Sequence, residues 1–285
     1  MKSGRFLTLF VWVYLLFLYL PVILLPLFAF NTGKIIAFPL KGFGFQWFYE
    51  LAKIEALHTA VWTSLKIAII TSVLATILGM FASRAATRFS FPGKGPIMGL
   101  IMVPLVLPEI IVAVSLIVVL IKVMGLGLSI WTIILGHVLI CVPFSIAILN
   151  GAFRSLDKSL EEASVDLGET KWTTFRLITL PLVMPGIISS LLISFVISLD
   201  EFIIAFFLTG SEPTLSVYIW GMLRFPGRIP AVMALGTIML IVSLLLLTAS
   251  EYFRRRGLRR SGVQDVGGFI CCLLYTSDAA DERLR

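Results

Sequence analysis

Carboxylates inside apolar stretches are the residues of this sequence whose positions suggest chemistry. Glu109, Asp200 and Glu201 each lie within or at the end of a long hydrophobic run. A charge inside a membrane is costly and is normally retained for a transport pathway or a partner. A cationic solute would need carboxylates along its route, because an unpaired ammonium group is expensive in a medium of low dielectric constant. We therefore expect these three residues to line a pathway for a cation.

Simpler interpretations of the same carboxylates stay open. Glu109 could form an ion pair with Lys66 or with a basic group on a partner protein. Asp200 and Glu201 are adjacent, so on a helix they project roughly 100° apart and cannot both face one pore. A further polar residue within a hydrophobic run, His137, fits a packed, hydrogen-bonded histidine better than a proton relay.

A second acidic group lies in the polar segment 152–181. An apolar stripe recurs there at spacings of 4, 3 and 4, which indicates a helix, and comprises Leu156, Leu160, Ala163 and Leu167. The polar positions around it are mainly acidic: Asp157, Glu161, Glu162, Asp166 and Glu169. A helix bound to a membrane surface carries Lys and Arg on its polar face. The acidic face therefore favours docking to another protein over binding to lipid headgroups.

The ends of that helix are marked by its flanking residues. Gly168 follows the stripe at the position where a left-handed C-terminal cap needs a residue without a Cβ atom. We expect a second short helix to begin at Thr170. Pro181 and Pro185 are then expected to bend the chain into the next apolar stretch.

No pattern for catalysis, a metal site or nucleotide binding accompanies these residues. Cys141 lies inside an apolar run and Cys271 and Cys272 are adjacent, so no metal-ligand spacing is visible. The sequence contains no G-x-x-x-x-G-K-[ST] phosphate-binding loop, and FPGKGP at 91–96 lacks both its first glycine and its hydroxyl. We expect no catalytic residue, no metal and no cofactor in this chain.

The composition is that of a membrane protein. The 285 residues are 59% hydrophobic and 14% charged, whereas soluble domains contain about 25% charged residues. A helix needs roughly 20 residues to cross a bilayer. Six stretches qualify, and they predict an all-α polytopic membrane protein with six transmembrane helices at about 7–30, 58–82, 97–121, 130–150, 182–208 and 231–250.

The basic residues predict the direction of the spans. Fourteen Lys and Arg residues fall on the side that carries both termini and the segment 152–181, against six on the other: Lys34, Lys41, Lys53, Lys122, Arg224 and Arg228. Short cytoplasmic loops carry the excess of positive charge. Both termini and the acidic segment are therefore expected in the cytoplasm, and the net charge of +7 is explained without nucleic acid.

The sequence divides into one transmembrane domain and a tail. We expect residues 1–260 to form a single transmembrane domain. Residues 261–285 follow a basic cluster and show no periodicity, cap or motif. We expect this tail to be disordered or foreign to the natural protein.

The segment EEASVDLG followed by ITLP resembles the EAA loop of permease subunits of bacterial ABC importers. That pattern is Glu-Ala-Ala, three residues, Gly, nine residues, Ile, one residue and Leu-Pro. The matching positions here are Glu162, Ala163, Gly168, Ile178, Leu180 and Pro181. Ser164 replaces the second Ala, which is a change between two small residues. SLDEFIIAFFLTG, in the fifth predicted span, looks most like the second permease of the spermidine/putrescine group.

The resemblance implies a type I ABC importer permease fold in a bacterial inner membrane, in a subunit that is not itself an enzyme. Coupling helices at 152–181 would dock on a separate ATPase through the six matching residues together with Glu161 and Asp166. The implied partners are two ATP-binding subunits, which hold the ATP, a homologous permease, an extracytoplasmic solute-binding protein and membrane lipid. The implied solute is spermidine or putrescine.

Two alternatives to a polyamine importer remain at this point. The first is an ABC permease for another small solute, such as ferric iron or an oxyanion, although the acidic residues in the spans disfavour an oxyanion. The second is a stand-alone secondary cation transporter or channel that uses Glu109 and Asp200. No inverted repeat is visible in the sequence, which argues against a secondary transporter. An EAA loop has no purpose in a secondary transporter or in a channel.

Overall fold

The chain is built almost entirely from helices. The computed structural model describes residues 2–34 and 36–260. Within those ranges the only β pairing is an isolated bridge between Asn31 and Phe43. The helices belong to two compact units, one of residues 2–61 and 217–244 and the other of residues 62–216 and 245–260.

The first unit contains the N-terminal helix and the first half of the last helix. Its elements are α1 (Lys2–Ala29), α2 (Gln46–Leu51), most of α11 (Leu215–Leu223), η4 (Pro226–Arg228) and the start of α12 (Ile229–Arg260). Buried Asn31 organises the loop after α1, since its side chain accepts from the backbone N–H groups of Gly33 and Lys41. The Trp47 indole donates to the Asn31 carbonyl at 2.6 Å.

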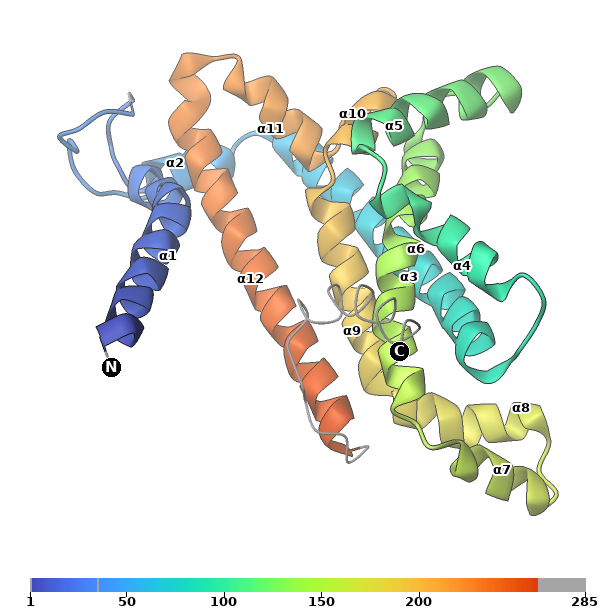
Figure 1. Cartoon of the computed structure of the whole chain (residues 1–285). Coiled ribbons are helices and arrows are strands. Elements are labelled where there is room, and N and C mark those ends of the chain that lie inside the picture. The colour runs from blue at the N-terminus through green and yellow to red at the C-terminus, as the bar shows by residue number, and fades with distance from the viewer. Residues whose placement is uncertain (1, 35, 261–285) are drawn as a thin grey trace. The chain divides into compact units, whose positions relative to one another are not determined.

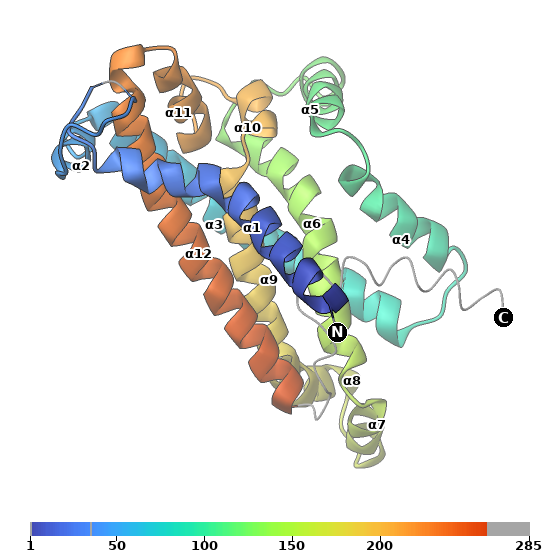
Figure 2. The ribbon, with the colours of Figure 1, turned by 60° about the vertical axis from the view of Figure 1, so that its left-hand side comes forward.

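The second unit contains the helices from α3 to α10, except the first turns of α3, together with the end of α12 (Figure 1 and Figure 2). In chain order they are α3 (Glu55–Arg88), α4 (Lys94–Met102), η1 (Val103–Leu105), α5 (Glu109–Ile117), η2 (Val118–Val123), α6 (Ile130–Arg154), α7 (Lys158–Asp166), α8 (Lys171–Thr174), η3 (Phe175–Thr179), α9 (Leu180–Asp200) and α10 (Ile203–Leu208). The loop candidate predicted from the sequence thus consists of α7, α8 and the π-helical turn η3.

Small residues allow α6 and α9 to pack along one another. A Cβ atom on Gly186 of α9 would come within 2.6 Å of the Ala152 Cβ on α6. Further along the interface the hydroxyls of Ser145 and Ser190 lie 2.7 Å apart, and Thr76 of α3 lies 3.1 Å from Ser190. Close packing of small residues and interhelical hydrogen bonds are what hold helices together where lipid removes the hydrophobic drive.

Five of the six predicted spans correspond to long apolar helices. Among the described residues, those long and apolar enough to cross a membrane are Leu7–Ala29, Glu55–Arg88, Ile130–Arg154, Lys171–Asp200 and Pro226–Arg256. A multi-pass membrane protein is therefore confirmed. The tail 261–285 lies outside the described residues.

The third predicted span, 97–121, is not one straight helix. The segments Lys94–Leu105 and Glu109–Val123 meet at an angle of 100°. Pro108 adopts an extended backbone conformation (ψ 129°) immediately before α5. Because a proline lacks an N–H and disfavours helical backbone in the residue before it, the helix ends before this point.

The fifth predicted span, 182–208, also differs from the expectation. Its helix ends at Asp200, and Glu201 is extended (ψ 119°) before the short α10 begins. At its other end the helix is not interrupted by Pro181 or Pro185, and it is continuous from Lys171. Pro181 falls in the first turn of α9, where its missing N–H costs nothing, and η3 occupies the place where α8 passes into α9 (Figure 1).

Candidate functional site: the loop between α6 and α9

The end of α7 and the start of α8 lie at the residues expected from the sequence, whereas Leu156, the first residue of the predicted helical stripe, precedes α7. The Asp157 side chain caps α7 by accepting from the Ser159 N–H at 3.0 Å, and this hydrogen bond lowers the pKa of Asp157. Thr170 caps α8 by accepting from the Thr173 N–H at 3.2 Å. Between them Gly168 has a φ of +92°, a conformation that side chains rarely adopt. The predicted left-handed cap and the predicted second helix are confirmed.

A buried pair of hydroxyls joins the two helices. The Ser164 Oγ on α7 lies 3.0 Å from the Thr174 Oγ1 on α8, and both residues are buried. Thr174 also donates to the Thr170 carbonyl at 3.0 Å. The hydroxyl at position 164, which departs from the family pattern, therefore lies inside the loop and away from its outer surface.

Glu161 contacts neighbouring helices through both carboxylate oxygens. One oxygen lies 2.7 Å from Nε of Arg88 on α3, an ion pair whose N–H is not aligned for a hydrogen bond. The other accepts from the hydroxyl of Thr179, at the end of η3, at 2.7 Å. The sequence placed Glu161 among the docking residues, but it did not indicate Arg88 or Thr179 as contacts of its carboxylate.

The base of the loop rests on an apolar cluster. Its buried members are Leu149, Phe153, Leu156 and Val183, with Met80, Ala152 and Ile187 packed against them. Leu156 belonged to the predicted apolar stripe and is the only one of its four residues in this cluster. The cluster joins the ends of α3, α6 and α9, so the loop starts from a packed platform.

The outer surface of the loop is apolar and exposed. Leu160 is 46% exposed, Leu167 87% and Trp172 66%. Five of the eight residues predicted to dock are also exposed, namely Glu162, Ala163, Asp166, Gly168 and Pro181, whereas Glu161, Ile178 and Leu180 are partly buried. Large exposed apolar side chains in one place mark an interaction surface. Carboxylates beside them fit a protein partner with basic groups at the rim.

The predicted pathway carboxylates lie at the two helix breaks. Glu109 is the first residue of α5 and is exposed. The Glu201 carboxylate accepts from the Ile204 N–H at 3.1 Å and so caps α10, which packs against α5. Asp200, which precedes Glu201 in the chain, is exposed. In the described part of the chain Glu109 forms no ion pair with Lys66.

Residues 75–259, more than half of the chain, match the family model described as "Binding-protein-dependent transport system inner membrane component". The chain belongs to this family. Members are inner-membrane permease components, so this permease is a multi-pass inner-membrane protein, and the expected family and fold class are confirmed.

Relatives of this permease match it over most of their length. It is 34% identical to the spermidine/putrescine transport system permease protein PotC of Haemophilus influenzae, over 87% of this chain and 95% of that protein. PotC of Escherichia coli is 32% identical over 84% of this chain and 90% of that protein. The putrescine transport system permease protein PotI of Escherichia coli is 34% identical, over 79% and 82%.

Solved structures share the fold of this permease. A chain of a bacterial alginate ABC transporter superposes with a TM-score of 0.67 at 20% identity, covering 90% of this chain and 94% of that one. A chain of the MetNI methionine ABC transporter gives 0.57 at 18% identity, covering 71% and 96%. At these identities the likeness shows the fold alone.

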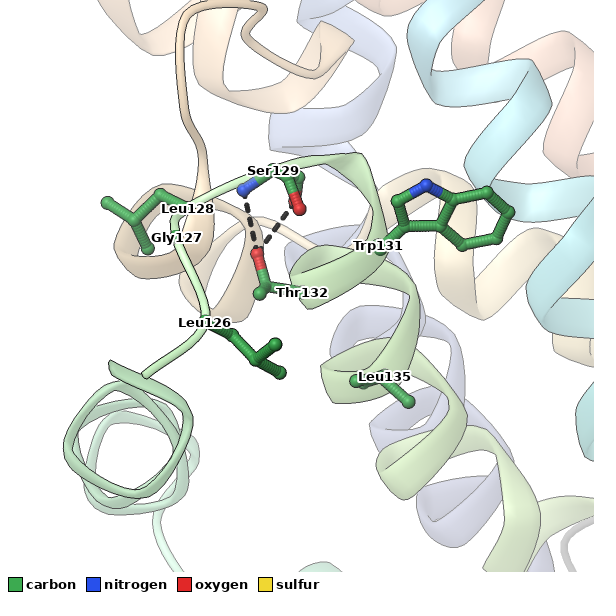
Figure 3. A pocket seen from close by; sticks show the side chains of 7 residues that line it. All are labelled: Leu126, Gly127, Leu128, Ser129, Trp131, Thr132 and Leu135. Atoms are coloured by element: carbon green, nitrogen blue, oxygen red, sulfur yellow. Dashed lines mark hydrogen bonds between the residues drawn. The ribbon is translucent and has the colours of Figure 1, made fainter. Parts of the chain in front are cut away.

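A separate cavity of about 370 Å³ lies where the chain enters α6. Figure 3 shows its lining, from Leu126 to Leu135, with the backbone N–H and carbonyl of Ser129 both hydrogen-bonded to the Thr132 hydroxyl. None of the predicted site residues lines it.

His137, further along α6, is buried and its Nδ1 lies 2.8 Å from the Ser198 hydroxyl. This confirms a packed, hydrogen-bonded histidine in the permease.

Proposed function

We propose that this permease is the membrane-spanning subunit of an ATP-driven importer for a polyamine such as spermidine or putrescine. The observation that carries the proposal is the match at 32 to 34% identity to permeases named for these solutes, across 82 to 95% of their length. The match includes both the loop and the spans with the acidic residues. The solved structures with the same fold belong to an alginate transporter and a methionine transporter. The fold by itself therefore does not identify the solute.

The loop is proposed as the docking element for a separate ATPase. Its exposed apolar residues, Leu160, Leu167 and Trp172, supply a surface that is unfavourable in water. Glu162 and Asp166 beside them provide charge for basic groups on the partner. The full assembly contains two ATP-binding subunits, a homologous permease and an extracytoplasmic solute-binding protein. ATP is held by the ATP-binding subunits, and this chain needs no cofactor.

The carboxylates at the helix breaks are proposed to line the route of the cation. Glu109, Asp200 and Glu201 stand where backbone irregularity frees polar groups, and such irregularity in a membrane is tolerated where it lines a cavity or is buried in protein. An ammonium group that leaves water there is stabilised by nearby carboxylates. The same charges would repel an oxyanion.

Both termini and the loop are proposed to face the cytoplasm, following the distribution of Lys and Arg. Single cysteines at exposed positions test this in intact cells, with Lys158 reporting the loop and Tyr49 the opposite side. We expect a membrane-impermeant thiol reagent to label position 49 and to leave position 158 unlabelled until the membrane is opened. Labelling of position 158 in intact cells would overturn the docking role together with the topology.

Reconstitution into proteoliposomes tests the function as a whole. The chain alone, and the chain with its ATPase, sister permease and binding protein, are compared for uptake of radiolabelled spermidine, ferric iron and sulfate. We expect ATP-dependent spermidine uptake by the complete assembly only. Uptake of spermidine by the chain alone would identify a secondary transporter or channel, and uptake of ferric iron or sulfate in its place would reassign the solute.

A further inference from the structure

Glu161 differs from its neighbour Glu162 in where its charge lies. Glu162 is exposed, whereas both oxygens of Glu161 are engaged, one by Arg88 of α3 and the other by Thr179 at the entrance to α9. The side chains of Arg88 and Glu161 are only 9% and 18% exposed. A carboxylate in this position is directed into the protein, away from an approaching partner.

Two further contacts bind the same end of α3 to the loop. Arg88 donates through Nη2 to the Leu156 carbonyl at 3.1 Å, just before α7 begins. Arg84, one helical turn earlier on α3, lies over the Phe175 ring at 4.2 Å, at the start of η3. A guanidinium over an aromatic face is attractive. The contacts therefore reach the loop before α7, within α7 and after α8.

We infer that Glu161 is a positioning residue that locks α7 to α3 and to the entrance of α9, so that a displacement of α7 carries α3 with it. We call the set Arg88, Glu161 and Thr179 the Glu161 joint. The inference rests on the proposed docking function, because it concerns how force on the docked loop reaches the spans.

The Glu161 joint is needed because few other contacts hold the loop to the spans. The Ser164–Thr174 pair joins α7 only to α8, within the loop itself. The link from α6 to α7 consists of the few residues between Arg154 and Lys158. Without the joint, a force from the docked ATPase would rotate the loop about this link and about η3 and would not move α3. A partly buried ion pair resists this motion, because separating it leaves an uncompensated charge in a poorly solvated site.

Distance measurement in the assembled transporter tests the joint directly. Spin labels at Lys158→Cys on α7 and Phe89→Cys after α3, both exposed positions, are placed in a chain whose native cysteines are replaced by serine. We expect the label-to-label distance to be the same in the nucleotide-free and nucleotide-trapped states. In Glu161→Gln we expect the distribution to broaden and to shift between those states. A wild-type distance that changes with nucleotide as much as in the variant would overturn the inference.

Transport per ATP hydrolysed gives the functional readout. We expect Glu161→Gln and Arg88→Gln to keep the ATPase bound and hydrolysing while uptake per ATP falls roughly tenfold, a factor within the usual range of coupling between sites. The double variant should be no worse than either single one. Arg154→Gln, which removes an exposed arginine at the end of α6, is the control and should behave as wild type. Unchanged uptake per ATP in both single variants would contradict the joint.

Substitutions of Thr179 test the joint independently if the Glu161→Gln variant fails to assemble. Thr179→Val removes one hydrogen bond of the joint and keeps the shape of the side chain, whereas Thr179→Ser keeps the hydroxyl. We expect Thr179→Val to lower uptake per ATP and Thr179→Ser to restore it; equal values for the two would count against the joint. Normal uptake in Gly168→Asp would instead remove the docking function itself, so the two failures are distinguishable.

Discussion

Ser164 and Thr174 meet in the interior of the loop, with their hydroxyl oxygens 3.0 Å apart and both residues buried. Thr174 donates to the Thr170 carbonyl, so Ser164 is the donor within the pair. The contact closes α7 onto α8 at the position where the family pattern has alanine. The outer surface of the loop is therefore unaffected by this difference.

Replacement of Ser164 distinguishes a local contact from a docking contact. We expect Ser164→Ala to cost about 1 kcal/mol or less, because Thr174 keeps its bond to Thr170 and no buried donor is orphaned. Ser164→Leu should cost about 1–3 kcal/mol through overpacking of a buried site. Thermal unfolding and spermidine uptake check both. Loss of uptake in a fully stable Ser164→Ala would show that the hydroxyl contacts the partner.

Gly168 is required for its backbone conformation. A Cβ atom there meets nothing within 4 Å, but φ is +92°, so we expect Gly168→Ala to destabilise the loop by roughly 1 kcal/mol. Gly168→Asn should destabilise the loop less, since Asn tolerates left-handed backbone. Gly168→Asp should abolish uptake while membrane insertion stays intact. Gly151→Ala on α6, also without a nearby atom, is the matched control. Equal behaviour of Gly168→Ala and Gly151→Ala would contradict the role of the cap.

Glu162 carries an exposed charge on the docking surface. We expect Glu162→Lys to abolish uptake and to weaken co-purification of the ATPase, because a reversed charge repels basic groups on the partner. Expression and membrane insertion should be unchanged. Glu50→Lys, at an exposed position of α2, serves as the control for reversal of a surface charge. Normal uptake by Glu162→Lys would remove this residue from the docking surface.

The three carboxylates at the helix breaks should affect the solute concentration that is required. We expect Asp200→Asn and Glu109→Gln to raise the spermidine concentration for half-maximal uptake, since each removes a charge from the route. Glu201→Gln should do the same while it keeps an oxygen for the Ile204 N–H, which separates the charge from the cap. Dose–response curves measured at several salt concentrations check this. Unchanged curves in all three variants would leave no cation route at these residues.

Close packing of α6 should make two glycines sensitive to size. A Cβ atom on Gly136 would lie 2.6 Å from the Ile204 Cγ2, and one on Gly186 2.6 Å from the Ala152 Cβ. We expect Gly136→Ala and Gly186→Ala to lower the melting temperature, with overpacking costs of about 1–3 kcal/mol. Gly99→Ala on α4, where nothing lies within 4 Å, should leave it unchanged. Equal melting temperatures for all three variants would contradict this packing.

Periodicity and composition were enough to locate most of the elements. Long apolar runs predict spans because a bilayer demands about 20 apolar helical residues whatever the neighbours are. Gly168 and Thr170 predicted the ends of α7 and α8 because caps depend on local backbone geometry. The break in the third span could have been anticipated from Pro104 and Pro108, which the sequence shows, but hydropathy alone does not detect a bend.

The sequence by itself determined that this chain spans a membrane through apolar helices, that a capped helical loop separates α6 from α9, and that acidic residues stand within the spans. Only the tertiary structure decided which acidic residues of the loop face inward. Glu161 and Glu162 are adjacent and alike in sequence, yet one binds Arg88 and Thr179 while the other is exposed. An ion pair depends on which side chains are brought together by packing, and Arg88 lies on a helix far away in the chain. The local sequence pattern therefore cannot predict the contact between Arg88 and Glu161.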